Sequence, residues 1–379
     1  MMSDINGHSK IKVLQFICPT GFYGAERWII ALAKGLDADI RCDLAVTIEP
    51  GMERLKIVDG YEAIGRDVHQ VMMKHRFDLS VVPRLKNLLR DGGYNLIHTH
   101  GYKSDILGLT AGRLAGVACV ATPHGFENAE DWKLRAYINL GNKFFKKFDI
   151  VAPLSEELCR DVEGFGVDKS KIRYIKNGVD LDEVEAKIAS RDANPVLQNK
   201  TKKRVGFIGQ MISRKNVFDL LDVFDQVAQQ RDDLELIMLG DGEQREELQQ
   251  YAATLASSSA IEFLGFRDDR LDWLQSFDLF AMTSTLEGIP RCLMESMAMG
   301  IPVAAYNIPG IDQLLVHENS GLLAEPGDKA TLVKHWQALL FDEPLAARIS
   351  ANARAFVVNE FSGRRMAHDY TQLFNELMN

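Results

Sequence analysis

Short apolar runs alternate with helix-like segments along most of this chain, and that alternation limits the possible folds more than any other feature. The run IKVLQFI at 11–17 ends before Pro19, and a glycine-containing loop then leads into apolar residues at helical spacing up to Leu36. Similar apolar runs follow at 42–49, 94–101, 117–125, 148–155, 204–209, 234–240, 261–265, 278–283 and 301–306. Strands that alternate with helices form parallel sheets, so we expect an α/β protein.

A chain of 379 residues is long enough for two domains. The region 182–204 is polar and contains Pro195, which is typical of a connection between domains. We therefore predict an N-terminal Rossmann-like domain at 1–185 and a C-terminal one at 200–360. Ligands bind beyond the carboxyl ends of parallel strands, so two such sheets facing one another would share a cleft.

The composition is that of a globular protein, with 46% hydrophobic and 26% charged residues. The net charge of −9 argues against broad nucleic-acid binding. Five scattered cysteines form no zinc or disulfide pattern and fit a reducing, cytoplasmic location. No apolar run approaches the roughly 20 residues of a membrane span, and the first residues do not resemble a secretory signal.

Two glutamates in the block TSTLEGIPRCLMESMAMGIPV carry most of the chemical information. Glu287 lies in a Gly/Pro loop after the apolar run at 278–283, and Glu295 lies one turn into the next helix-like segment. Unpaired backbone N–H groups at such a helix start, together with the helix dipole, can hold a phosphate while carboxylates reach neighbouring hydroxyls. A sugar nucleotide offers both kinds of group.

Several motifs agree in order and spacing with one family. They are GAER, NLIHTHGYKSDILG, ATPHG, PLSEEL, IKNGVD, FIGQMISRKNVFDLL, IMLGDGE, EFLGF, the block from TSTLEGIPR to IPGIDQLL, and ENSGLLAEPGD. With them the chain resembles the retaining glycosyltransferases of family 4, group 1, over nearly its whole length. The resemblance implies the GT-B fold, in which two Rossmann-like domains face each other across a cleft. It also implies that a C-terminal helix at 361–379 crosses back to the first domain, and that closure of the domains brings the site together.

The resemblance assigns the donor site to the second domain. It implies that Glu287 faces hydroxyls of the transferred sugar and that Glu295 accepts hydrogen bonds from the ribose, roles that suit ionised carboxylates. An ordinary loop carboxylate, the alternative for Glu287, fits poorly with Gly288 and Pro290. A solvated helix position, the alternative for Glu295, fits poorly with its apolar flanks Met294, Met297 and Ala298. The loop Gly288, Ile289 and Pro290 precedes the helix, and the backbone N–H groups of Arg291, Cys292 and Leu293 would face the diphosphate.

Cations for the leaving diphosphate are expected after the strand that ends at Gly209. Lys215 matches the family lysine and Arg214 precedes it, so both would neutralise the charge that builds on the nucleoside diphosphate. Gln210 stands where many family members carry an arginine, so one cation is missing or replaced by Arg214. The alternative for the pair is an exposed helix start, where positive charge is unfavourable.

In the first half, Gly21 and Gly24 bracket a loop that would let a ligand approach the backbone. His124 matches the family histidine that contacts the donor sugar; the alternative is a packed or capping histidine. His98 and His100 share one side of a strand end, but two histidines are weak evidence for a metal, and the resemblance implies neither metal nor cofactor.

Other positions receive lesser roles from the resemblance. The loop from Gly265 to Arg267 would recognise the base largely through backbone atoms, so the sequence says little about which base, although a UDP-sugar is favoured. Tyr306, Asn307 and Gly310 are candidates to line the site. The turn residues Asn177, Gly178 and Asp180 are interpreted as structural.

The segment 132–148 combines aromatic and cationic residues with no acidic residue. One reading is a helix at an anionic membrane surface, which would give peripheral contact at the cytoplasmic face of the inner membrane. The other is a surface helix covering the N-terminal sheet. The residues concerned are Trp132, Lys133, Arg135, Tyr137, Lys143, Phe144, Phe145, Lys146, Lys147 and Phe148.

The predicted reaction is transfer of a sugar from a nucleoside diphosphate sugar to an acceptor hydroxyl, with retention of configuration and without a metal. The acceptor class implied is a carbohydrate or lipid-linked glycan, as in bacterial polysaccharide assembly. A nucleotide-sugar epimerase and a catalytically silent binding subunit stay as alternatives. A dinucleotide dehydrogenase is disfavoured because PTGFYGAERW lacks the full glycine spacing.

Overall fold

The protein forms two compact units, each with its own sheet. The computed structural model describes residues 11–19, 21–22, 24–51, 55–75, 78–125, 141–229 and 231–379. The first unit comprises Met1–Gly178 together with Gly363–Asn379, and the second comprises Val179–Ser362. The division after Gly178 lies earlier in the chain than the boundary expected at residue 185, and the C-terminal segment belongs to the first unit.

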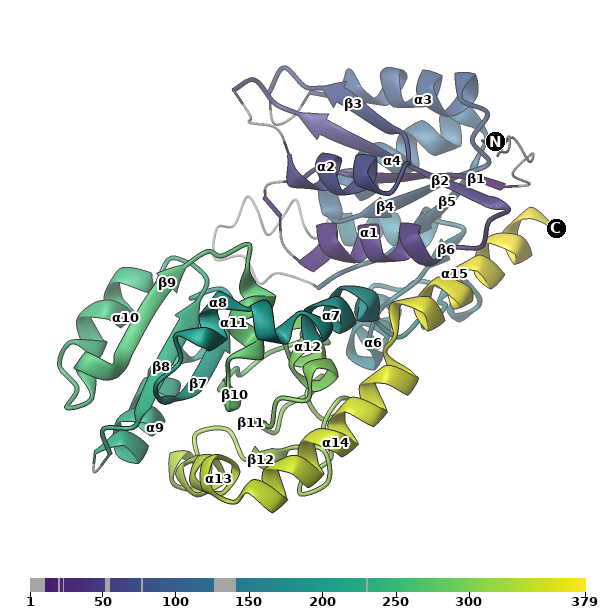
Figure 1. Cartoon of the computed structure of the whole chain (residues 1–379). Coiled ribbons are helices and arrows are strands. Elements are labelled where there is room, and N and C mark those ends of the chain that lie inside the picture. Colours follow the sequence, from purple (N-terminus) through teal and green to yellow (C-terminus); the bar gives the residue numbers. More distant parts are fainter. Residues whose placement is uncertain are drawn as a thin grey trace, which may run out of the picture. The chain divides into compact units, whose positions relative to one another are not determined.

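The first unit contains a six-stranded sheet in the order β3-β2-β1-β4-β5-β6, in which every neighbouring pair is parallel (Figure 1). This is the order of a Rossmann fold, in which the chain changes direction between β1 and β4. The strands are β1 (Ile11–Ile17), β2 (Ile40–Ile48), β3 (Val68–Met72), β4 (Leu96–His100), β5 (Ala118–Ala121) and β6 (Ile150–Val151). The α-helices are α1 (Gly24–Gly35), α2 (Lys56–Ala63), α3 (Val81–Asp91), α4 (Tyr102–Ala115), α6 (Glu156–Gly164) and α15 (Gly363–Met378).

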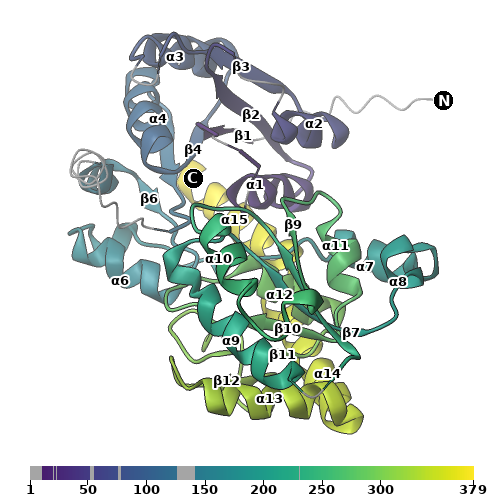
Figure 2. The same cartoon turned by 90° about the vertical axis from the view of Figure 1, so that its left-hand side faces the viewer.

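Alternating side chains of β1 enter two separate cores, one on each face of this sheet. Val13 joins the core formed with α1, α2 and α15, whereas Leu14 and Phe16 join the core formed with α3 and α4. Helix α15 packs along α1, and α3 packs along α4 (Figures 1 and 2). The C-terminal helix is therefore part of the first unit's own core.

The second unit repeats this topology with the order β12-β11-β10-β7-β8-β9, again parallel throughout. Its chain changes direction between β7 and β10. The strands are β7 (Lys203–Ile208), β8 (Leu234–Leu239), β9 (Ile261–Gly265), β10 (Leu279–Met282), β11 (Val303–Tyr306) and β12 (Leu322–Ala324). The α-helices are α7 (Leu181–Ala189), α8 (Pro195–Gln198), α9 (Val217–Ala228), α10 (Arg245–Ala252), α11 (Arg270–Gln275), α12 (Arg291–Met299), α13 (Lys329–Phe341) and α14 (Glu343–Glu360).

The polar region 182–204 was expected to be a linker, and that expectation is wrong. Asp180 caps α7 by accepting a hydrogen bond from the backbone of Glu183 at 3.2 Å. Asn194 caps α8, and Pro195 occupies the first helical position, where its missing N–H costs nothing.

Within the described residues, no helix is long and apolar enough to cross a membrane.

Candidate active site

The turn after β7 places two cations at the carboxyl end of the second sheet. It is a short 3-10 turn, Ser213–Lys215, followed by Asn216 in the left-handed conformation with φ 45°. The hydroxyl of Thr283, just after β10, donates to the carbonyl of Asn216 at 2.9 Å, and the amide of Thr285 donates to that of Arg214 at 2.8 Å. These bonds join the turns after β7 and β10, the two strands at which the chain changes direction.

Glu287 is buried against these cations, with 5% of its surface exposed. The ammonium of Lys215 donates to Oε1 of Glu287, and the guanidinium of Arg214 lies 3.5 Å from Oε2. Lys215 is itself buried, whereas the Arg214 side chain is 43% exposed. The three groups carry one net positive charge, and the exposed Arg214 makes that charge accessible to an anion.

Glu295 of α12 is held by two arginines, Arg270 of α11 and Arg291 at the start of α12. Its Oε1 accepts from Arg270 and from Arg291, each at 2.8 Å, and its side chain is 2% exposed. Glu183 of α7 lies 3.4 Å from Arg270 and 3.9 Å from Arg291 and completes the network. Burial alone would raise the pKa of Glu295, but the two guanidinium charges outweigh it and lower that pKa to about 2.

Helix α12 begins beside both glutamates. Pro290 stands at its N-cap position and supplies no side-chain cap hydrogen bond. The backbone N–H groups of Arg291, Cys292 and Leu293 therefore keep the anion-binding character of a helix start. Burial raises the pKa of Cys292 to about 12, so its thiol stays protonated and is no nucleophile.

Gly310 packs against the backbone of the Glu287 loop. A Cβ built on Gly310 would lie 1.8 Å from the carbonyl oxygen of Gly288, and the residue has φ +90°. Only glycine fits this approach. Gly310 thus supports the loop, whereas Tyr306 is fully buried and donates to Asp219 at 2.8 Å, so it does not line the site.

The remaining donor-side residues are less constrained. Gly209 directly follows β7, and Gly288 and Ile289 lie in the loop before α12. Gly265 has φ +69°, and a Cβ there would lie 3.3 Å from the guanidinium of Arg245. Gln210 is exposed.

In the first unit, His124 lies three residues after β5 in a cluster of rings. Its Nε2 is 3.1 Å from Nδ1 of His100, and its ring centroid is 5.1 Å from that of Trp28. His98 Nε2 is 2.7 Å from the hydroxyl of Thr122, which is 2.7 Å from that of Tyr370 on α15. His98 and His100 are buried, and His124 is partly buried.

Burial keeps these histidines neutral. It lowers the pKa of His124 to about 4, and it lowers the pKa of His98 and of His100 well below the usual value, with help from the neighbouring histidines. No group of three or more His, Cys, Asp or Glu residues in the described part of the chain could hold a metal ion. Gly24 begins α1 and Gly21 lies in the loop before it, a small part of which is not described.

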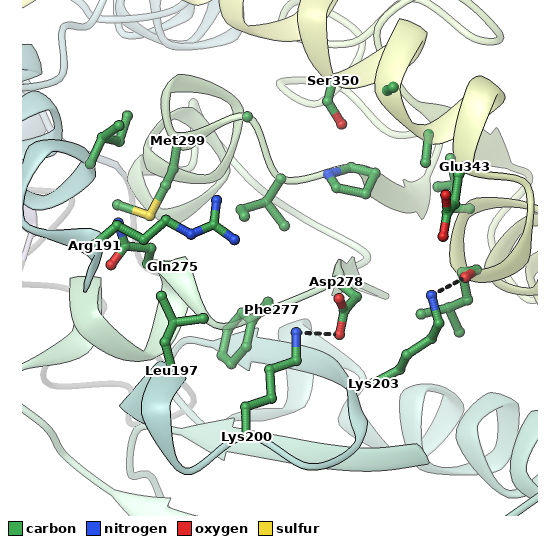
Figure 3. A pocket seen from close by; sticks show the side chains of 18 residues that line it. Arg191, Leu197, Lys200, Lys203, Gln275, Phe277, Asp278, Met299, Glu343 and Ser350 are labelled. Carbon is green, nitrogen blue, oxygen red and sulfur yellow. Dashed lines mark hydrogen bonds and ion pairs between the residues drawn. The ribbon is translucent and has the colours of Figure 1, made fainter. Parts of the chain in front are cut away.

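A cavity of about 450 Å³ lies at the opposite ends of the strands of the second sheet, near the amino ends of β7, β10 and β11 (Figure 3). Lys200 pairs with Asp278 at 2.6 Å in it, and Lys203 donates to the carbonyl of Leu340 at 2.9 Å. None of the predicted donor residues lines this cavity.

Much of the segment 132–148 lies outside the described residues, Trp132, Lys133, Arg135 and Tyr137 among them. In its described end, Phe145 and Phe148 are buried in the core that α3 and α4 cover.

Comparison with known proteins identifies the family and the fold of the chain. Residues 190–356 match the family described as glycosyl transferases group 1, and residues 22–183 match glycosyltransferase family 4. The chain belongs to the family 4, group 1 glycosyltransferases. This glycosyltransferase has the GT-B fold: the structure of Anabaena HepE in complex with UDP superposes with a TM-score of 0.79 at 21% identity, over 97% of this chain and 100% of that one.

Two relatives illustrate the range of the family. The UDP-Gal:alpha-D-GlcNAc-diphosphoundecaprenol alpha-1,3-galactosyltransferase of Escherichia coli is 28% identical, over 75% of this chain and 76% of its own length. The phosphatidyl-myo-inositol mannosyltransferase of Mycobacterium leprae is 27% identical, over 89% of this chain and 90% of its own. Bacterial enzymes that build polysaccharides and lipid-linked glycans are therefore among its relatives.

Sequence reasoning missed Arg270 and Glu183, which complete the Glu295 network. Arg270 lies in a helix of otherwise mixed character, and Glu183 lies in the region interpreted as a linker. The available signal was the position of Arg270 at helical spacing from the apolar residues Leu271 and Leu274, because a buried cation needs a carboxylate partner.

Proposed function

We propose that this enzyme transfers a sugar from a nucleoside diphosphate sugar, with a UDP-sugar as the first candidate, to a hydroxyl of a carbohydrate or lipid-linked glycan. The transfer retains the anomeric configuration and needs no metal ion. The observation that carries the proposal is the pairing of Glu287 with Lys215 and Arg214 beside the start of α12. Cations, helix amides and a carboxylate gather where the chain changes direction between β7 and β10, the usual ligand position in such sheets.

The chemistry follows from these charges. As the bond from the anomeric carbon to the diphosphate oxygen breaks, negative charge builds on the diphosphate, and Arg214, Lys215 and the α12 amides stabilise it. The acceptor hydroxyl attacks from the face that the diphosphate leaves, and a leaving phosphate oxygen takes its proton. Glu287 is already paired with two cations, so it binds sugar hydroxyls and is not a covalent nucleophile. Glu295 stays ionised and accepts hydrogen bonds from the ribose.

The relatives guide the choice of substrates. The Escherichia coli relative is named for UDP-Gal and a diphosphoundecaprenol-linked acceptor, which supports testing a UDP-sugar with a polyprenyl diphosphate glycan. A lipid-linked acceptor would place the reaction at a membrane surface, at the cytoplasmic face of the inner membrane.

The first experiment is thermal stabilisation by UDP-, GDP- and ADP-sugars. We compare the native enzyme with Glu295→Gln and Lys215→Met. The control is Lys200→Met, which removes the ion pair with Asp278 near the amino ends of the strands of the same sheet. UDP-sugars should stabilise the native enzyme and the control, and each donor-site variant should lose most of that shift. Stabilisation by no nucleotide class would reject the donor-site assignment.

Activity is then measured as UDP release with and without polyprenyl diphosphate glycans, in the presence and absence of a chelator. Acceptor-dependent release that the chelator leaves unchanged is expected. Donor binding without release in any acceptor mixture would favour a silent sugar-nucleotide-binding subunit, and release that stops on chelation would contradict metal independence.

A further inference from the structure

A continuous chain of hydrogen bonds runs from the interior of the first sheet to His124. Gln15 of β1 places its Oε1 2.5 Å from Nε2 of His100, which ends β4. Nδ1 of His100 is 3.1 Å from Nε2 of His124. At the inner end, the Gln15 amide nitrogen donates to Sγ of Cys42 on β2 at 3.4 Å. Gln15 and Cys42 are fully buried and His100 is 3% exposed, so solvent does not compete with these bonds.

The donors and acceptors of this chain follow from the chemistry of its members. An amide oxygen can only accept, so Nε2 of His100 carries the proton that it shares with Gln15. A neutral imidazole has one protonated nitrogen, so Nδ1 of His100 is an acceptor. The contact between the two rings is then a hydrogen bond only if Nε2 of His124 is the donor.

This reasoning leaves Nδ1 of His124 with a lone pair. His124 is partly exposed, and no described residue bonds to that nitrogen. We propose that the Gln15–His100 chain holds His124 in its Nε2-protonated tautomer, so that Nδ1 accepts a hydrogen bond from a substrate hydroxyl. Gln15 and His100 are positioning residues in this arrangement. The part that concerns the substrate rests on the proposed function.

The fixed tautomer determines which group can bind. A bare imidazole nitrogen attracts an O–H group and repels a phosphate or carboxylate oxygen, so His124 selects a sugar hydroxyl and not the diphosphate. Its neutral, weakly basic ring also makes it a poor general base at neutral pH, because burial lowers the pKa of His124 to about 4. The histidine therefore binds and orients a hydroxyl without removing its proton.

The tautomer can be read directly. Long-range ¹H–¹⁵N spectra of the full chain labelled at histidine distinguish the two neutral tautomers, and His124→Gln identifies the signals of that ring. We expect the native enzyme to show the Nε2-protonated form at His124. If the side-chain amide of Gln15 were turned by 180°, its NH₂ group would face Nε2 of His100, and donor and acceptor would exchange in both bonds that lead to His124. His124 would then be protonated at Nδ1, and finding that form would overturn the proposal.

Two variants test whether the chain sets the tautomer. Gln15→Leu removes the acceptor, so His124 should become a mixture of both forms or change to the other one. Thr122→Val removes the bonds to His98 and Tyr370 in the same core and leaves the chain intact, so His124 should keep the native form. An unchanged His124 in Gln15→Leu would reject the role of the chain.

Kinetics test the hydroxyl. The variants are compared at temperatures equally far below their own unfolding midpoints. Gln15→Leu should lower kcat/KM for the sugar donor or acceptor about tenfold, whereas UDP alone should bind as in the native enzyme. The kcat/KM of Thr122→Val should stay within twofold of the native value. A deoxy-sugar substrate lacking the bound hydroxyl should erase the difference between native enzyme and Gln15→Leu. Weaker binding of UDP by Gln15→Leu, or an equal loss with every deoxy-sugar, would reject the hydroxyl contact. If no UDP-sugar serves as donor although the tautomer is as expected, the proposed function and the hydroxyl contact fail, whereas the role of the chain stands.

Discussion

Glu287 and Glu295 of the second unit are buried and yet remain acceptors, because two cations accompany each of them. For Glu295 those cations are Arg270 and Arg291, which bond to the same carboxylate oxygen, Oε1. A buried charge of this kind is retained only when its partners are in place. The orientation of the carboxylate toward a ligand therefore depends on residues that need not touch that ligand.

Arg270→Met tests this dependence. The variant leaves Glu295 with one cation and lets its carboxylate rotate, so we expect the Kd for a UDP-sugar to rise about tenfold, a loss of about 1.4 kcal/mol. Asp272→Asn is the control, since Asp272 lies on α11 like Arg270 and the change removes its ion pair with Lys187 of α7. Calorimetric titration measures both, and a Kd for Arg270→Met within twofold of native would show that Arg291 alone orients Glu295.

At this scale the sequence singled out candidate residues but not the side chains that pair with them. Glu287, Glu295 and Lys215 were identified from motif position, and the structure shows all three buried in one unit. Their ion pairing, and the part of Arg270, depend on contacts between segments far apart in the chain. No local pattern contains that information.

Among the elements, the loop after β11 determines where the Glu287 loop lies. Gly310→Ala would place a methyl group within 1.8 Å of the Gly288 carbonyl and add strain at φ +90°. We expect a stability loss of about 2 to 4 kcal/mol and loss of most donor binding. Gly327→Ala is the matched control, since Gly327 has φ +85° and nothing within 4 Å of its Cβ position. Equal donor affinity in the two variants would show that Gly310 does not support the site.

Helix α15 is bound to the first unit through an apolar face. Phe374 is fully buried in the core shared with α1, so Phe374→Ala should destabilise the first unit by about 3 to 5 kcal/mol. Phe341→Ala on α13 removes a side chain that is 38% exposed and should cost under about 1.5 kcal/mol. Chemical denaturation measures both, and equal losses would contradict the packing of α15 as described.

The regular elements were largely predictable because buried parallel strands read as short apolar runs. The strand β3, VHQVM, escaped because two polar residues interrupt it and only Val71 is buried, and β12 because it has only three residues. The helix α7 escaped because its sequence is largely polar. The helix α8 escaped because Asn194 and Pro195 resemble a loop, whereas here they start a helix. Such caps are recognised only once the following residues are known to pack.

At the scale of the whole molecule, the chain divides at Gly178 and returns to the first unit at Gly363. The return could be predicted only from the family, since neither composition nor periodicity of 361–379 shows which sheet the helix joins. The two units also contain different buried titratable groups. The first has the neutral histidines 98, 100 and 124, and the second has the ionised Glu295.

These groups predict that acid destabilises the first unit at higher pH than the second. Below pH 6.5 an unfolded chain protonates its histidines, whereas His98, His100 and His124 stay neutral in the folded unit, so the free energy of unfolding decreases as pH falls from 6.5 toward 4. Asp105 acts in the opposite direction, because burial raises its pKa to about 7 and the folded state binds its proton first. Near pH 5 the unfolded chain binds about three more protons at these histidines, and the folded state binds about one more at Asp105. The net difference of about two protons changes the free energy of unfolding by about 3 kcal/mol per pH unit.

Thermal unfolding followed from pH 7 to pH 4.5 measures this slope. Asp105→Asn removes the opposing group and should steepen it by about one proton, or about 1.4 kcal/mol per pH unit. In the second unit the stability that Glu295 contributes is present above pH 4.5 and is lost only as pH falls toward 2, so Glu295→Gln should leave the slope between pH 7 and pH 4.5 unchanged. A first unit whose stability does not decrease over this range would mean that the three histidines accept protons without unfolding, and that the ring cluster around Trp28 opens to solvent in the native state.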